Sequence, residues 1–157
     1  MFHRSSRPPP VHVVKLAAVV VLLALFAGCA GQDELTGDRR DVGVVTVVFT
    51  AMPAKVQAGE VVRLRLRVSD NAGTAQQLTT RTSQLYDFWV TDRGREIWRW
   101  SRDQSFVQSV TTTELEAQSS RVFIATWDPD RIGTLKVYGE VKAQGFEGPL
   151  EGTVVVR

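Results

Sequence analysis

The sequence is poor in the side chains that most often perform catalysis or bind metal ions. Its 157 residues include one cysteine, Cys29, and two histidines, His3 and His12, and all three lie near the N-terminus. Beyond residue 29, therefore, no disulfide, no Ser-His-Asp or Cys-His catalytic group and no ordinary zinc site can form. We expect a protein that is not an enzyme, that holds no metal or cofactor, and that is stabilised by packing alone.

The N-terminal residues have the pattern of a bacterial export signal. Basic residues precede an apolar run over residues 16–26, which is too short to span a bilayer comfortably. The run ends in Leu25-Phe26-Ala27-Gly28-Cys29, which resembles a lipobox with phenylalanine where leucine is usual. The pattern predicts a cleaved lipoprotein signal peptide over residues 1–28 and lipidation of Cys29. A free cysteine in a transmembrane anchor is the alternative.

The chain has no large excess of charge of either sign. Its formal net charge is +2, but the predicted signal peptide contains three of the 19 basic residues and none of the 17 acidic ones. The mature chain would carry a charge of about −1. This balance gives no ground for binding nucleic acid.

Residues 29–43 are predicted to be a lipidated, flexible tether. They are rich in Gly, Asp and Arg and have few apolar side chains, a composition that cannot bury a core. With Cys29 lipidated, the protein would be anchored to the cell membrane or the outer membrane and would face away from the cytoplasm.

Past residue 29 the sequence also lacks a convincing helical period. Instead, aliphatic residues at positions 62, 64, 66 and 68 alternate with Arg63, Arg65 and Arg67, and similar short runs recur between turns. This spacing predicts an all-β, antiparallel, immunoglobulin-like β-sandwich over residues 44–157. The arginine row reads as a solvated face, with a docking patch for an acidic partner as the alternative.

Residues 83–101 contain most of the aromatic side chains and are predicted to form a β-hairpin. Residues 85–91 and 95–100 flank Asp92-Arg93-Gly94, whose glycine suits a tight turn. Trp98 and Trp100 share one face and are expected to point into the core, so that the hairpin supplies much of that core. An exposed tryptophan platform for carbohydrate is the alternative.

A set of residues in and after this hairpin resembles the intracellular proteinase inhibitor (BsuPI) domain family. The resemblance covers about residues 44–143. It rests on Ser83, Gln84, Tyr86, Asp87, Phe88, Val90, Thr91, Asp92, Glu96, Trp98, Arg99, Trp100, Ser101, Phe106, Trp127 and Asp128. We expect these motif residues to be structural.

The resemblance implies a monomeric binding module that blocks a subtilisin-like serine proteinase without chemistry of its own. Because the chain has an export signal, that proteinase would lie outside the cytoplasm. The alternative is a structural or adhesive lipoprotein of the cell envelope that binds another protein or a glycan. Acid–base catalysis by Asp87 and Glu96 is the third reading, against which an ion-pair role is favoured.

The predicted proteinase-contact loop is Gln144-Gly145-Phe146-Glu147-Gly148-Pro149. Phe146 and Glu147 lie between two glycines, and a large apolar residue suits the main pocket of a subtilisin-like cleft. Residues 101–105 are the rival loop. Two aspartates, Asp128 and Asp130, could begin a calcium site, but a proline turn explains them more simply.

Overall fold

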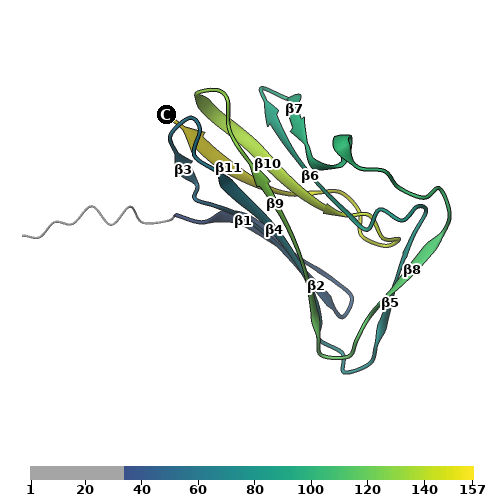
Figure 1. Ribbon diagram of the computed structural model, residues 1–157. Helices are drawn as coiled ribbons and strands as arrows, with labels where there is room; N and C mark the ends of the chain where they lie inside the picture. The colour runs from purple at the N-terminus through teal and green to yellow at the C-terminus, as the bar shows by residue number, and fades with distance from the viewer. Residues whose placement is uncertain (1–33) are drawn as a thin grey trace, which may run out of the picture. The chain divides into compact units, whose positions relative to one another are not determined.

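The computed structural model describes residues 34–157, which form two packed antiparallel sheets and a small third one (Figure 1). The predicted immunoglobulin-like β-sandwich is confirmed. The elements are β1 (Thr36–Val42), β2 (Val45–Met52), β3 (Lys55–Val56), β4 (Val62–Asp70), β5 (Gln76–Thr80), β6 (Tyr86–Asp92), β7 (Arg95–Arg99), the 3₁₀ turn η1 (Trp100–Asp103), β8 (Thr111–Leu115), β9 (Ser120–Trp127), β10 (Gly133–Val141) and β11 (Leu150–Val156).

The first sheet has the strand order β1-β2-β4-β9 and the second the order β3-β11-β10-β6-β7, while β5 pairs with β8 alone. All neighbours are antiparallel except β3 and β11. Contacts of β2 with β11 and of β4 with β10 bring the two larger sheets face to face.

The core lies between these two sheets and is mainly aliphatic. The alternation predicted for β4 is confirmed, because its aliphatic side chains are fully buried and its arginines are exposed. Phe49 of β2 and Phe88 of β6 are the largest fully buried side chains. Gly139 of β10 must be a glycine, because a Cβ there would lie 2.4 Å from the ring of Phe49.

The predicted hairpin is confirmed as β6 and β7, and its connection is tighter than the sequence indicated. Asp92 pairs with Arg95, so the turn consists of Arg93 and Gly94 alone. Both have positive φ, 49° and 82°, as in the two-residue type I′ turn whose twist suits a hairpin. The register shifts by one residue after Val90, which is a β-bulge.

The hairpin contributes less to the core than its composition predicts. Phe88 is fully buried, whereas Trp98 and Trp100 pack against the core but remain partly exposed. Trp100 lies in η1 rather than in β7. The reason is position: β7 is the edge strand of its sheet, so a neighbouring strand covers it on one side only.

The prediction that the flexible tether extends to residue 43 is wrong, because β1 occupies residues Thr36–Val42. β1 pairs with β2 over its whole length, from Thr36 opposite Ala51 to Val42 opposite Val45. Its polar composition is that of an edge strand, which needs backbone pairing rather than a buried side-chain row. Arg40 also donates hydrogen bonds to the carbonyl oxygens of Gly148 and Pro149, at 2.9 and 3.0 Å.

Asp70, at the end of β4, joins two turns at that end of the sandwich. Its carboxylate accepts hydrogen bonds from the backbone N–H groups of Gln118, Ala72 and Gly73, at 2.9 to 3.3 Å. These donors, with Gln118 the strongest, hold the pKa of Asp70 below its ordinary value. They also support Gln118 in its left-handed backbone conformation.

Candidate functional site

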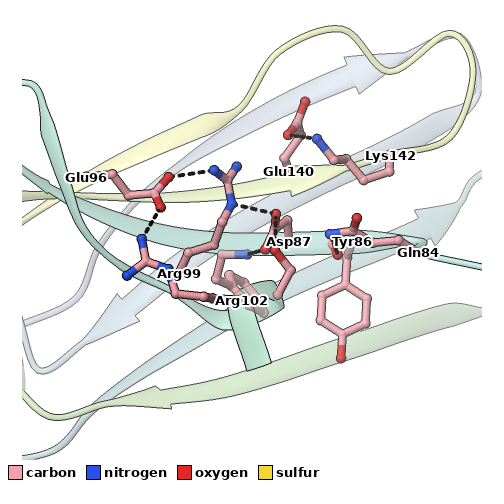
Figure 2. Close-up of polar contacts among 10 residues, drawn as sticks. Gln84, Tyr86, Asp87, Glu96, Arg99, Arg102, Glu140 and Lys142 are labelled. Atoms are coloured by element: carbon pink, nitrogen blue, oxygen red, sulfur yellow. Dashed lines mark hydrogen bonds and ion pairs between the residues drawn. The ribbon is translucent and has the colours of Figure 1, made fainter. Parts of the chain in front are cut away.

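Asp87 of β6 is the centre of a polar network on the outer side of the second sheet (Figure 2). The residue is only 2% exposed. Its carboxylate accepts hydrogen bonds from Arg99 Nε, from Ser101 Oγ and from the backbone N–H of Phe88, all at 2.9 Å. These bonds satisfy a buried charge that would otherwise be costly.

The network continues from Arg99 to the end of η1. Arg99 also donates to Glu96 at 2.5 Å, and the second oxygen of Glu96 accepts from Arg102 at 2.8 Å. Asp87 and Glu96 are therefore joined by the guanidinium of Arg99, and their expected role as ion-pair partners is confirmed. The network fixes η1 to both strands of the hairpin.

Aromatic rings form a second connection, a column that joins η1 and β6 to β9 of the first sheet. Tyr86 is stacked between Trp100 and Phe123, with ring centroids 4.4 and 4.3 Å away. Phe106 packs on the other end of Trp100 at 6.1 Å. Burial in this column, with the nearby charge of Asp87, raises the pKa of Tyr86.

The segment that follows η1, residues 104–110, is the exposed feature to which both the network and the column lead. We call it the Val107 loop. Val107 and Val110 are 66% and 72% exposed, which is unusual for two large apolar side chains in one short segment. Phe106, directly before Val107, is held against Trp100.

The backbone of the Val107 loop is fixed at Val107 itself. The N–H of Val107 donates to Ser83 Oγ at 2.9 Å, and the N–H of Ser83 donates to the carbonyl oxygen of Val107 at 3.0 Å. Ser83 thus holds both backbone groups of a residue whose side chain points to solvent. This combination is a backbone fixed by hydrogen bonds that presents an apolar side chain.

All of these residues lie in the part of the chain that a family model matches. The model of the intracellular proteinase inhibitor family, BsuPI, matches residues 49–146. The chain belongs to the BsuPI family. No curated protein is similar enough in sequence to be matched to it.

Solved structures resemble the BsuPI chain in fold alone. The CARDB domain of a Pyrococcus furiosus protein has 15% identity and a TM-score of 0.46, over 77% of this chain and 94% of that one. The alkylpurine DNA glycosylase AlkC of Pseudomonas fluorescens has 16% identity and a TM-score of 0.45, over 73% of this chain and 30% of that one. The sporulation control protein Spo0M of Bacillus subtilis has 14% identity and a TM-score of 0.45, over 74% of this chain and 50% of that one.

The residues by which the sequence resembles BsuPI domains are not all in one place. Tyr86, Asp87, Trp100, Ser101 and Phe106 come together in the network and the column, with Phe88 in the core beneath them. In contrast, Trp127 is buried at the end of β9, where Val62 lies opposite, and Asp128 after it is exposed. Trp98 packs on the core opposite Val90.

The predicted contact loop, with Phe146 and Glu147, lies between β10 and β11. Glu147 is exposed, but the ring of Phe146 is half-buried against the core beside Val141 and Leu150. Next to the ring is a groove of about 450 Å³, lined among others by Arg81 and Lys142. Cys29, the predicted lipidation site, lies outside the described residues.

Sequence reasoning missed two residues of the site, Arg99 as its connecting ion and Val107 as its exposed tip. Arg99 stands between two tryptophans of the motif, so its spacing was a usable signal. For Val107 the sequence offered no signal, because its fixed backbone depends on Ser83, 24 residues earlier.

The glycan reading finds little support in the outward-facing aromatic residues. On the outer face of the second sheet, the ring of Trp89 lies between Tyr138, at 5.2 Å, and the guanidinium of Arg99, at 4.8 Å. Tyr138 and Arg99 come from the strands on either side of β6, so both faces of the indole are covered. A sugar ring stacks on an open aromatic face, which Trp89 does not offer.

Over residues 34–157 no group of three or more His, Cys, Asp or Glu side chains is placed to hold a metal ion. Of the two aspartates in the calcium alternative, Asp128 is exposed, and Asp130 forms an ion pair with Arg131 at 3.0 Å. In the same part of the chain no helix has the length and hydrophobicity needed to cross a membrane.

Proposed function

We propose that this protein is a lipid-anchored inhibitor of a subtilisin-type serine proteinase outside the cytoplasm, and that the Val107 loop enters the proteinase's substrate cleft. The family match supports inhibition of a proteinase in general. One observation carries the choice of loop: the backbone of Val107 is hydrogen-bonded on both sides to Ser83 while its side chain is 66% exposed.

Such a loop suits inhibition because a proteinase cleft binds extended backbone. A segment that is already ordered loses little conformational entropy on binding, so more of the contact energy appears as affinity. The Val107 loop needs no catalytic group of its own, and an interface of about 800 Å² on each partner is typical of proteinase–inhibitor complexes. The network and the column then act as the rigid base of the loop.

Phe146, the contact residue predicted from the sequence, is the alternative to Val107. Its loop is also held, since Arg40 binds three of the loop's carbonyl oxygens. However, its ring is partly packed on the core, and to fill a proteinase pocket it would have to give up those contacts. Val107 has no such contacts to lose.

The test adds this protein, purified as the full chain, to a subtilisin-type proteinase and measures how far it slows cleavage of a chromogenic peptide. We expect stoichiometric inhibition. Val107→Asp should raise the inhibition constant by about 30-fold or more, the size of effect expected at a hot-spot residue. Ile132→Asp is the matched control, because Ile132 is similarly exposed, at 74% against 66% for Val107, in a different turn.

Three outcomes distinguish the alternatives. Loss of inhibition in Phe146→Gly, with Val107→Asp unchanged, would assign contact to the loop between β10 and β11. Equal loss in Val107→Asp and Ile132→Asp would show a non-specific charge effect. No inhibition by the wild-type protein would contradict the inhibitor function and favour an adhesive lipoprotein of the cell envelope.

Membrane anchoring rests on the lipobox-like pattern before Cys29. Two or more acyl chains, at about 0.8 kcal/mol for each buried methylene, bind a bilayer firmly, whereas one chain does so only marginally. In cells, Cys29→Ala should therefore leave the protein uncleaved or release it from the membrane fraction. Mass spectrometry and fractionation check this. An unchanged mass and unchanged fractionation would contradict lipidation.

A further inference from the structure

The two larger sheets have four edge strands, and three of these are poorly suited to pair with another chain. β3 has two residues, β7 has five, and β7 is bulged and rich in charge. β1 carries four charged residues in succession, from Asp38 to Asp41. Short length, bulges and charge are the usual means by which proteins prevent sheet edges from pairing.

β9 has little of this protection, because its one charged residue is Arg121, the second residue of the strand. It is eight residues long, pairs with β4 without a bulge, and contains no charged residue or proline from Val122 to Trp127. In the described part of the chain β4 is its only partner strand. Val122 and Ile124, on its outer face, are 41% and 52% exposed.

The free edge of β9 is also held in a fixed position. Its inward side chains alternate with the exposed ones: Phe123 stacks on Tyr86 at 4.3 Å, and Ala125 and Trp127 are buried. A strand anchored in this way is an ordered template, so an added strand would not first have to organise it.

The charge beside this edge is positive and mostly unpaired. Arg65 and Arg67 lie on β4 directly opposite Ile124 and Val122 and share their outer face, with Arg63 next in the row. Over residues 34–157, neither Arg63 nor Arg65 forms an ion pair, and the hydrogen bonds of the Arg67 side chain go only to the hydroxyl of Ser120. The carboxylate of this face, Asp41, is bound to Arg39 at 3.2 Å.

We propose that β9 is a docking edge to which an acidic partner protein adds an extended segment as a further β-strand. The added backbone would pair with β9, and its outward apolar side chains would cover Val122 and Ile124. Strands in a sheet are about 4.8 Å apart, so the backbone of the new strand would lie about 10 Å from the backbone of β4. Arginine and glutamate side chains together can bridge that distance.

A second copy of this chain is the less suitable occupant. Pairing of β9 with β9 would place two arginine rows on one continuous face and would bring no carboxylate to either row, because the outer residues of β9 are Ser120, Val122, Ile124 and Thr126. The docking edge is distinct from the Val107 loop, so the two proposals can fail separately.

The test uses the full chain and a synthetic peptide in which valine and glutamate alternate, labelled for fluorescence anisotropy. We expect the peptide to bind at least about 10-fold more tightly than the same peptide with lysine in place of glutamate. N-methylation of its backbone on the pairing edge should abolish binding, because it removes the hydrogen-bond donors.

Two variants locate the site. Arg65→Glu with Arg67→Glu should reverse the preference, so that the lysine peptide binds better. Ile124→Lys should weaken binding of the glutamate peptide about 10-fold, since a charge on an edge strand blocks pairing, while the exposed control Ile132→Lys should not.

Equal binding of the two peptides, or a preference unchanged by the arginine reversal, would overturn the proposal. So would a wild-type dimer in solution that Ile124→Lys dissociates, because β9 would then pair with a second copy. Retained inhibition of a proteinase by the Ile124→Lys variant would show that the Val107 loop and the docking edge are separate.

Discussion

Replacing Trp127 by alanine is expected to destabilise the domain by about 3–5 kcal/mol, the cost usual for a large buried aromatic residue. Trp127 is 3% exposed at the end of β9, and the fully buried Val62 lies directly opposite on β4. Its removal would leave a cavity where the two sheets must stay packed. Domains of this size are stable by only about 5–15 kcal/mol, so much of that margin would be lost.

Urea denaturation, followed by the fluorescence of the remaining tryptophans, measures this loss. Trp98→Ala is the matched control: the same side chain is removed, but from an edge strand where it is partly exposed. We expect a clearly smaller effect there, and likewise for Trp100→Ala. If Trp98→Ala were as damaging as Trp127→Ala, the burial pattern of the tryptophans described above would be wrong.

Asp87→Ala is the second substitution with a large expected effect. It removes the acceptor shared by Arg99 and Ser101 at the buried centre of the network. Loss of one partner from a buried ion pair commonly costs 3–5 kcal/mol. Arg99 is about one-third exposed and would keep Glu96, so we expect about 2–4 kcal/mol.

The substitution should also weaken inhibition in excess of what unfolding explains. Ser101 and Trp100 belong to η1, and Phe106 packs on Trp100 just before Val107. With η1 released, the Val107 loop would have to be ordered again on binding, which costs free energy.

Two further variants separate the effect of the network on stability from its effect on inhibition. Asp87→Asn keeps the shape and one acceptor oxygen, so its stability should lie between wild type and Asp87→Ala. Glu96→Gln changes the exposed end of the network and should cost less than either. Full inhibition by folded Asp87→Ala would show that the network does not support the contact loop.

Some features of this protein follow from the sequence alone. The absence of His and Cys after residue 29 excludes several kinds of chemistry, whatever the fold. The alternation in β4 predicts which side chains are buried, because successive side chains of a strand point to opposite faces. The hairpin around Gly94, though not its exact turn length, and the BsuPI resemblance are likewise local patterns of residue type. Local rules are enough where the cause of the structure is local.

Other features were decided by the tertiary structure, because their cause lies far away in the chain. The polar residues of β1 form a strand because β2 supplies hydrogen bonds along their whole length. Trp127 is buried and Trp98 is not, although both are tryptophans in strands, because the side chains that cover them come from other elements. Val107 is an ordered tip only because Ser83 binds both of its backbone groups. Composition and periodicity contain no information about such distant partners, so only the folded arrangement of the two sheets could assign these roles.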